Sequence, residues 1–183
     1  MNLIVYSSGE AEWDNGRVRC ALGLGGISHK KSEGDGVTPA GRFLLRHVFY
    51  RADRIERPRT TLPLSTLSKK AGWCDSPFDT SYNKFVSLPF RGHHEKLWRN
   101  DAIYDLFAVV GYNDRPVIPN AGSAIFIHVA TPGFEATKGC VAFALPDLLK
   151  ILENWQPESA LEIRTSGLGV PLTAPYGHPT AKN

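Results

Sequence analysis

The sequence predicts one mostly β domain with a few short helices. Three observations support this prediction: short apolar runs recur along the chain, turn-forming glycine, proline and asparagine residues separate them, and one longer segment has the periodicity of a helix. The 183 residues suffice for a single domain with a substantial core. With 42% hydrophobic and 21% charged residues, the composition is typical of a globular protein and not of a disordered one.

The first third of the chain is expected to consist mainly of strands. Apolar runs at residues 2–7 and 17–24 flank the turn 14–16, whose Asn-Gly pair favours a tight β-hairpin. A loop that contains glycine and lysine is expected over residues 23–36. Alternating apolar and polar side chains then predict a strand over residues 42–50.

The middle of the chain is expected to be less regular. Residues 51–70 are charged and contain proline, and a connection of this length is either a functional lid or a mobile segment. Both interpretations stay open. We expect turns over residues 72–81, a short strand over 85–89, a short helix over 94–100 and an apolar strand over 103–111.

The last third contains the helix with the clearest pattern. An apolar, β-branched run over residues 123–130 predicts a strand. Over residues 145–155, a proline stands in the first turn and leucines recur on one face, which predicts an amphipathic helix. A final strand is expected over residues 160–165. We assign residues 1–165 to one domain and the Gly- and Pro-containing residues 166–183 to a tail.

Two residues near the end of this strand pattern are candidates for covalent chemistry. The run over 123–130 contains His128, and after eleven intervening residues Cys140 follows Gly139 at the head of a second apolar run. Two strands joined by a loop would bring thiol and imidazole together at the mouth of an open cleft, where the histidine can take the thiol proton. Structural roles are the alternative, because cysteine is often buried and histidine often serves the fold through a hydrogen bond.

The residues around this pair resemble a known family. The stretch Thr137-Lys138-Gly139-Cys140-Val141 resembles the [S/T]-x-G-C-[I/V] signature of the L,D-transpeptidase (YkuD-type) catalytic domain, and residues 36–43, GVTPAGRF, resemble the G-x-T-P-x-G-x-F segment of such domains. The resemblance covers most of residues 1–155 and indicates a divergent branch of the family. It implies a β-sandwich or barrel-like core.

The same resemblance implies a reaction. Cys140 would attack a peptidoglycan stem peptide to form a thioester, and His128 would serve as its base. The acyl group would then pass to the amine of a second stem and form a cross-link. Gly139 leaves room for the approaching carbonyl, and backbone N–H groups of Gly139 and Cys140 could hold the oxyanion. No cofactor and no metal are required.

Further residues are candidates for substrate binding. Thr137 matches the signature and could orient the cysteine loop, and Tyr112 lies where relatives carry a hydroxyl near the oxyanion. Asn83, Trp98 and Arg99 could line a groove for the stem peptide, since the guanidinium fork matches a carboxylate. The alternatives are a buried aromatic role for Tyr112 and ordinary surface packing for Trp98 and Arg99.

Departures from the family pattern leave other functions open. Ala142 stands where most members carry a basic or amide residue, and the loop between His128 and Cys140 is shorter than usual. Water as the acceptor would make the protein a thiol-dependent carboxypeptidase or amidase. A non-catalytic peptidoglycan-binding module is a further alternative, although the intact pair argues against it.

Two other enzyme classes fit the sequence less well. A papain-like peptidase usually places its cysteine before its histidine, which is the reverse of the order found here. A metal hydrolase would need a ligand cluster, and His93-His94-Glu95 lacks the i, i+4 histidine pair of zinc proteases. We therefore expect no metal site.

The charge and the cysteine content limit the kinds of partner and of metal site that we expect. The net charge of +3 comes without a dense Lys/Arg stripe, so no nucleic-acid partner is expected. The sequence leaves the oligomeric state open, and a monomer is our expectation. The cysteines at 20, 74 and 140 have no zinc-type spacing. Cys20 is expected in the core, and Cys74 is either a redox partner or a packed thiol, with packing the preferred interpretation.

The start of the chain bears on localisation. Residues 1–6 form too short an apolar run for a signal peptide, and no run of eighteen apolar residues is present to span a membrane. By sequence we therefore expect a cytoplasmic location and no membrane insertion. A place in the cell envelope would need an unrecognised export route or a native start upstream.

Overall fold

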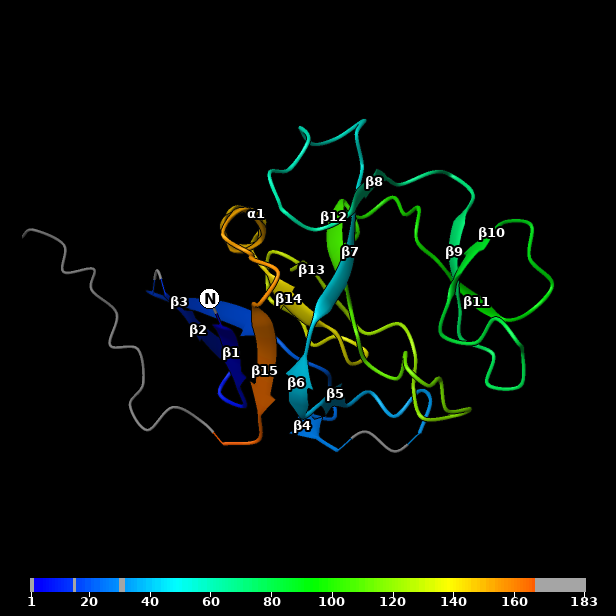
Figure 1. Ribbon diagram of the computed structural model, residues 1–183, viewed down its shortest axis with the longest axis horizontal. Helices are drawn as coiled ribbons and strands as arrows, with labels where there is room; N and C mark the ends of the chain where they lie inside the picture. The colour runs from blue at the N-terminus through cyan, green and yellow to red at the C-terminus, as the bar shows by residue number, and fades with distance from the viewer. Residues whose placement is uncertain (1, 15, 30–31, 167–183) are drawn as a thin grey trace, which may run out of the picture.

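A curled ten-stranded sheet forms the body of the protein in the computed structural model, which describes residues 2–14, 16–29 and 32–166 (Figure 1). The strand order is β6-β15-β1-β2-β3-β14-β13-β12-β7-β8. A three-stranded sheet, β10-β9-β11, and a short β4–β5 pair complete the strands. The elements are β1 (Asn2–Tyr6), β2 (Glu10–Trp13), β3 (Gly16–Ala21), β4 (Ile27–Ser28), β5 (Thr38–Pro39), β6 (Gly41–Phe43), β7 (Leu45–Tyr50), β8 (Leu64–Thr66), β9 (Ala71–Cys74), β10 (Phe85–Ser87), β11 (His94–Lys96), β12 (Leu106–Val110), β13 (Phe126–Val129), β14 (Val141–Phe143), α1 (Leu145–Glu153) and β15 (Ala160–Arg164).

The sheet curls because two consecutive strands, β6 and β7, pair near its opposite ends. β6 and β7 are separated only by Leu44, yet β6 pairs with β15 at one edge of the sheet and β7 pairs with β12 near the other edge. The two ends of the sheet must therefore come close together at Leu44. The mostly β, barrel-like fold predicted from the sequence is confirmed, and the strand expected over residues 42–50 is divided into two.

The main core lies inside this curl and is closed by α1. The helix buries Leu148, Ile151 and Leu152 against it, while Pro146 occupies the first turn, where no intrahelical N–H donor is needed. The predicted helix is thus confirmed, and Figure 1 shows it above β13 and β14. The core residues are Leu3, Val5, Ala11, Trp13, Cys20, Leu45, Val48, Tyr50, Leu106, Ala108, Val110, Ile125, Ile127, Val129, Val141, Phe143, Leu148, Ile151, Leu152, Trp155, Leu161 and Ile163.

A second cluster lies on the outer face of β12, β13 and β14. The three-stranded sheet β10-β9-β11, which we call the roof, packs over this face. Every residue of β12, β13 and β14 is buried as a result, which explains their uninterrupted apolar runs. The cluster consists of Leu67, Ala71, Trp73, Leu97, Tyr104, Phe107, Val109, Phe126 and Cys140.

Three expectations from the sequence are wrong. The run over residues 2–7 does not pair with 17–24, because β2 lies between them and pairs with both. The short helix expected over residues 94–100 is instead strand β11, which is held by β9. The turns expected over residues 72–81 begin inside β9, whose four residues are all buried in the roof and the second cluster. In each case pairing with a distant strand overrides the local pattern.

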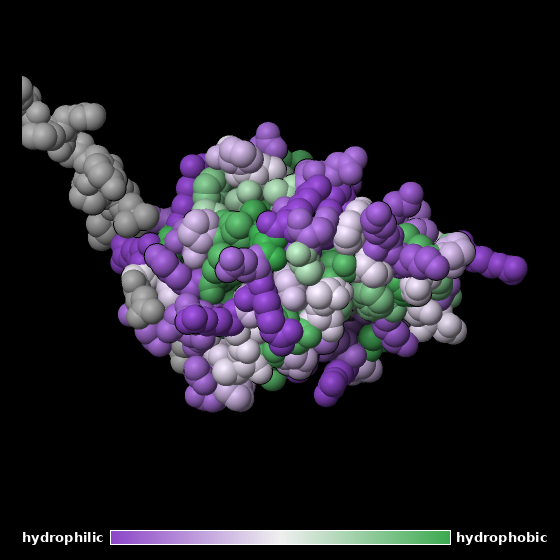
Figure 2. All heavy atoms as spheres, turned by 90° about the horizontal axis from the view of Figure 1, so that it is seen from above, coloured by the Kyte–Doolittle hydropathy of each residue, from purple (hydrophilic) through white to green (hydrophobic). Residues whose placement is uncertain are grey.

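The segment 51–70 is attached to the body at several points. Arg51 donates a hydrogen bond to the carbonyl oxygen of Arg99 (2.9 Å), and Arg54 pairs with Asp105 (2.8 Å). At the other end, Thr61 donates to the carbonyl oxygen of Trp155 (2.6 Å). Figure 2 shows the molecule from the side of this segment, where hydrophilic residues cover most of the surface and smaller apolar areas lie between them. The segment is thus an anchored connection in this structure.

Among the described residues, no helix has the length and apolar character needed to cross a membrane. Nearly all of the expected C-terminal tail lies outside the described residues.

Candidate active site

His128 and Cys140 lie on the same face of neighbouring strands. β13 and β14 run parallel, and their register sets His128 beside Ala142. Cys140 therefore stands level with Phe126, two residues behind His128. Side chains placed in this way are diagonal neighbours, because a strand spacing of about 4.8 Å and a rise of about 6.6 Å over two residues put their Cα atoms about 8 Å apart. The sheet thus brings the two predicted residues together.

Backbone groups of the segment leading into β13 hold the thiol. Cys140 Sγ donates to the carbonyl oxygen of Ala124 (3.2 Å) and accepts a hydrogen bond from the backbone N–H of Phe126 (3.3 Å). Ala124 has a φ of +53°, in the left-handed region that L-residues other than Gly, Asn and Asp rarely adopt. An N–H donor at the sulfur would stabilise negative charge that develops there.

The imidazole of His128 is held in one tautomer. Nδ1 lies 2.9 Å from the carbonyl oxygen of Val129, which can only accept, so Nδ1 carries the proton and Nε2 keeps its lone pair. Burial lowers the pKa of His128 from its ordinary 6.5 to about 4, the hydrogen bond to Val129 opposes this shift, and the charge of Arg99 adds to it. The ring is therefore neutral at pH 7 and able to accept a proton.

The pair is less accessible than the sequence led us to expect. Cys140 is 7% exposed and His128 is 5% exposed. Both lie on the face covered by the roof, where Cys140 belongs to the second cluster together with Trp73 of β9. The structure therefore places the pair beneath the roof rather than at the mouth of an open cleft.

Thr137 and Gly139 shape the loop that presents the cysteine. Thr137 Oγ1 donates to the carbonyl oxygen of Cys140 (2.7 Å) and accepts from the backbone N–H of Gly139 (3.1 Å). Gly139 has a φ of +130°, and a Cβ at this position would lie 2.9 Å from the carbonyl oxygen of Val37. Both residues of the signature thus have a backbone role, and Thr137 holds the loop backbone at Gly139 and Cys140.

The segment 36–43 packs directly against this loop. Thr38 is fully buried, and its Oγ1 accepts a hydrogen bond from the backbone N–H of Gly23 (2.7 Å). A Cβ on Gly23 would lie 2.9 Å from the Cα of Gly139, so the two backbones can approach this closely only because residue 23 is glycine, and a Cβ on Gly139 would in turn meet the carbonyl oxygen of Val37. The two sequence motifs, about a hundred residues apart, therefore meet at Gly139.

Sequence reasoning missed Tyr104 and Glu95. The Tyr104 ring meets the His128 ring edge to face at 5.5 Å, and its hydroxyl donates to Glu95 Oε1 (2.7 Å) on β11. Burial raises the pKa of Glu95. Burial also raises the pKa of Tyr104 well above its ordinary value, and charge on Cys140 adds a smaller effect in the same direction. Tyr104 therefore connects the roof to the candidate pair, and only the unexpected strand β11 brings Glu95 there.

Asn83 fixes the backbone that faces the thiol. Its Oδ1 accepts hydrogen bonds from Trp73 Nε1 (3.0 Å) and from the N–H of Ala124 (3.1 Å), and its Nδ2 donates to the carbonyl oxygens of Tyr112 and Asn113. The side chain is thus committed to protein partners. In this structure it positions Ala124.

The other predicted substrate residues lie at different distances from the pair. Arg99 reaches the neighbourhood of the site, because its guanidinium is 5.8 Å from the centre of the Tyr104 ring while it pairs with Asp101 (2.7 Å). Trp98 lies under the guanidinium of Arg51 at 3.5 Å. The hydroxyl of Tyr112 donates to the carbonyl oxygen of Ala121 (2.6 Å) and is therefore engaged away from the thiol.

The described part of the chain contains no group of three or more His, Cys, Asp or Glu side chains that could hold a metal ion. Cys20 and Cys74 are both buried, and neither forms a disulfide. Packing, the preferred interpretation of both residues, agrees with this burial.

Comparison with known proteins agrees with the motifs. The family model YkuD, described as the L,D-transpeptidase catalytic domain, matches residues 2–163. The match begins at the start of β1, ends within β15 and includes both candidate residues. Comparisons with curated proteins and with solved structures gave no match.

Proposed function

Because the chain belongs to the L,D-transpeptidase catalytic domain family, we propose that it is a cysteine-dependent acyltransferase that cross-links peptidoglycan stem peptides. One observation carries the proposal: within the family match, the sheet register sets a neutral histidine and a cysteine as diagonal neighbours on one face. Peptidoglycan stem peptides are the substrates of the family, and the chain retains both groups that the chemistry needs.

The first half of the reaction would load the acyl group onto sulfur. The proton of the Cys140 thiol, held in this structure by the Ala124 carbonyl, moves to Nε2 of His128 as Sγ attacks the donor carbonyl carbon. The tetrahedral intermediate then collapses, the C–N bond breaks, and the departing amine takes the proton from Nε2. Because the pKa of His128 is low, its imidazolium releases the proton readily in this step.

The oxyanion of the intermediate would be stabilised by backbone N–H groups at the cysteine loop. Gly139 donates to Thr137 Oγ1 in this structure, and the backbone N–H that we assign to the oxyanion is that of Cys140, the residue that forms the thioester. One such donor contributes roughly 3–4 kcal/mol in other enzymes. Thr137 would keep this part of the loop in place through its bond to the Cys140 carbonyl.

The second half would transfer the acyl group. An amine of a second stem attacks the thioester carbonyl and loses its proton to Nε2 of His128. The C–S bond then breaks, and the sulfur recovers its proton from the imidazolium. Water in place of the amine would release a shortened stem, which is the hydrolytic alternative.

Incubation with purified tetrapeptide muropeptides, followed by mass spectrometry of protein and products, tests the proposal. We expect a mass gain on Cys140 and cross-linked dimers from the wild type, and neither from Cys140→Ala. Cys20→Ala serves as the control, because Cys20 is buried in the main core on the inner side of the sheet. It should retain both signals.

The other outcomes separate the alternatives. A protein adduct with shortened stems and no dimers would replace transfer by hydrolysis. Muropeptide binding that persists in Cys140→Ala, with no adduct on the wild type, would replace the enzyme by a binding module. An adduct that appears equally in Cys140→Ala would reject Cys140 as the nucleophile.

A further inference from the structure

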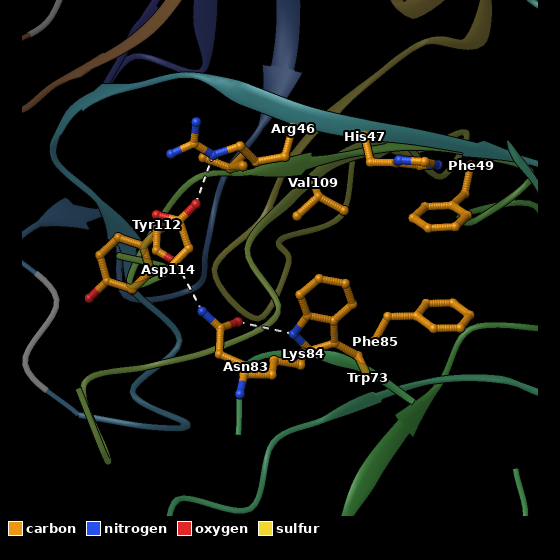
Figure 3. Close-up of a pocket in the computed structure, with 11 residues that line it drawn as sticks. Arg46, His47, Phe49, Trp73, Asn83, Lys84, Phe85, Val109, Tyr112 and Asp114 are labelled. Carbon is orange, nitrogen blue, oxygen red and sulfur yellow. Dashed lines mark hydrogen bonds and ion pairs between the residues drawn. The ribbon is translucent and has the colours of Figure 1, made fainter. Parts of the chain in front are cut away.

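The roof has two outer strands, and one of them borders the candidate pair. Among the described strands, the order β10-β9-β11 leaves one side of β11 and one side of β10 without a neighbouring strand. From β11, Glu95 accepts the hydroxyl of Tyr104, whose ring meets that of His128. β10 instead borders a cavity of about 340 Å³ whose lining includes Phe49 and Phe85 (Figure 3). The open edge of β11 is therefore the one that lies beside the pair.

The backbone groups of β11 point alternately toward β9 and toward this open edge. Two hydrogen bonds bound the β9–β11 ladder: Leu97 N–H to the Ala71 carbonyl oxygen (3.1 Å) and Asp75 N–H to the His93 carbonyl oxygen (3.4 Å). Every second residue between these bonds also faces β9, which assigns Glu95 to the ladder. His94 and Lys96 therefore turn their N–H and C=O groups away from β9, toward the open edge.

This edge is accessible to another chain. Lys96 is exposed and His94 is half-buried, and no other segment of the described chain hydrogen-bonds to the backbone of either residue. An open edge of this kind can accept an extended peptide as an additional strand. Lysines and inward-facing acids also protect edge strands from unwanted pairing. Here the contact with Tyr104 accounts for the inward position of Glu95.

The loop that presents the thiol approaches the same strand. Burial raises the pKa of Glu95, and the charges of Arg99 and Lys138 oppose that shift, so both cations lie near this carboxylate. Lys138 is exposed and stands two residues before Cys140. A peptide bound along the edge of β11 would therefore lie beside the cysteine loop.

The cover over the pair favours a thin occupant. Cys140 is 7% exposed and His128 is 5% exposed, so a folded partner could not bring a carbonyl group to the sulfur, whereas a single extended chain is narrow enough to enter beside β11. Packed sheets lie about 10 Å apart, and an extended chain advances about 3.3 Å per residue. About three residues would thus separate the part of the peptide that pairs with β11 from the carbonyl that Cys140 attacks.

We propose that the open edge of β11 binds the donor stem peptide in an extended conformation, through backbone hydrogen bonds to His94 and Lys96. The N–H of Lys96 donates to a stem carbonyl oxygen, and the carbonyl oxygen of Lys96 accepts a stem N–H. Such a pair uses main-chain groups only, so the side chains of the stem are free to differ. The inference rests on the proposed function, which supplies the peptide.

A proline substitution at the edge tests the contact from the side of the protein. Lys96→Pro removes the outward N–H and no hydrogen bond of the β9–β11 ladder. In the Cys140→Ala background, isothermal titration with a purified tetrapeptide stem should give a Kd about fivefold higher or more, the effect of one lost hydrogen bond. With Cys140 present, the donor concentration at half-maximal thioester formation should rise by the same factor, and the rate at saturation should not change.

Two control variants separate this contact from other effects. Ser87→Pro places a proline on the opposite edge of the roof, at an equally exposed residue whose N–H also points away from β9, because the flanking bond from Leu88 N–H to Lys70 (2.7 Å) assigns Leu88 to the ladder. It should leave the Kd unchanged. Lys96→Met removes the charge and keeps the N–H, and it should bind within about twofold of the parent. Circular dichroism confirms the fold of each variant.

A change in the peptide tests the same contact without altering the fold. Stems that carry a single N-methyl group, at each backbone amide in turn, lose one N–H donor. Methylation at one amide should raise the Kd for the Cys140→Ala protein about fivefold and should cause no further loss in the variant that also contains Lys96→Pro. This scan decides the question even if Lys96→Pro does not fold.

Several results would overturn the inference. An unchanged Kd for Lys96→Pro, an equal loss in Ser87→Pro or Lys96→Met, or a methylation scan without a sensitive amide would each remove the edge from stem binding. Dimers in sedimentation experiments that Lys96→Pro abolishes would assign the edge to a second copy of the chain. A wild-type adduct whose donor dependence ignores Lys96→Pro would reject this inference alone, whereas the absence of both adduct and stem binding would reject the proposed function as well.

Discussion

Acidification should destabilise the fold through His128. Burial sets the pKa of this residue at about 4 in the folded protein, against an ordinary 6.5. Between these two pH values the unfolded chain binds a proton at His128 and the folded protein does not, so the free energy of unfolding falls as the pH falls. The difference of about 2.5 pH units corresponds to a loss of about 3 kcal/mol by pH 4.

Urea denaturation between pH 7.5 and pH 4 measures this loss. Other groups also titrate in this range, so the quantity of interest is the difference between the wild type and His128→Gln, whose polar amide does not titrate. The wild type should lose about 3 kcal/mol more than the variant between pH 6.5 and pH 4. His29→Gln, which changes an exposed histidine, should follow the wild type.

Equal pH dependence of wild type and His128→Gln would refute the reasoning. It would mean that the folded protein accepts a proton on His128 as easily as the unfolded chain does. The imidazole would then be a poor candidate for a neutral base beneath the roof.

Three further substitutions test the structure around the site. Gly139→Ala should lower the free energy of unfolding by about 2 kcal/mol or more, as measured in urea, because the backbone has a φ of +130° and the new Cβ would lie 2.9 Å from the Val37 carbonyl. Thr137→Val should lower it by about 1–2 kcal/mol and slow thioester formation, since it removes the bonds to Gly139 and Cys140, whereas Thr137→Ser should preserve both quantities. Leu148→Ala should lower the unfolding free energy by about 2–5 kcal/mol in the same urea assay without changing adduct formation per folded molecule, because Leu148 is fully buried in the main core away from the pair. Wild-type stability in any of the three variants would contradict the corresponding contact.

The sequence was sufficient to locate the candidate pair because its signals are local. A glycine before Cys140 and an apolar run that contains His128 can be read directly from neighbouring residues. The family resemblance then supplied the fold, and the strands that carry the pair agree with it. The packing of Val37 against Gly139 shows why the two motifs occur together, although no single-sequence pattern predicts that contact.

The roof could not be predicted because its strands have little local signal. β9 contains a glycine and a cysteine beside Trp73, and β11 consists of His94, Glu95 and Lys96, which are not typical strand residues. They become strands by pairing with each other over an apolar face. For this reason no local pattern indicates that Glu95 meets Tyr104, or that the thiol and imidazole are covered.

β2 was missed for a related reason. Its residues Glu10, Ala11, Glu12 and Trp13 alternate between half-buried acids and buried apolar side chains. Four residues with two carboxylates are too short a pattern to distinguish from a turn, and the pairing with β1 and β3 decides the outcome.

The position of β15 has a consequence for how the protein is assembled during synthesis. β15 is the last described strand to be translated, yet it lies between β6 and β1, which are both made early. Until it emerges from the ribosome, each of those strands has an edge without its hydrogen-bonding neighbour. The segments that carry the imidazole and the thiol are therefore synthesised before the barrel around them can close.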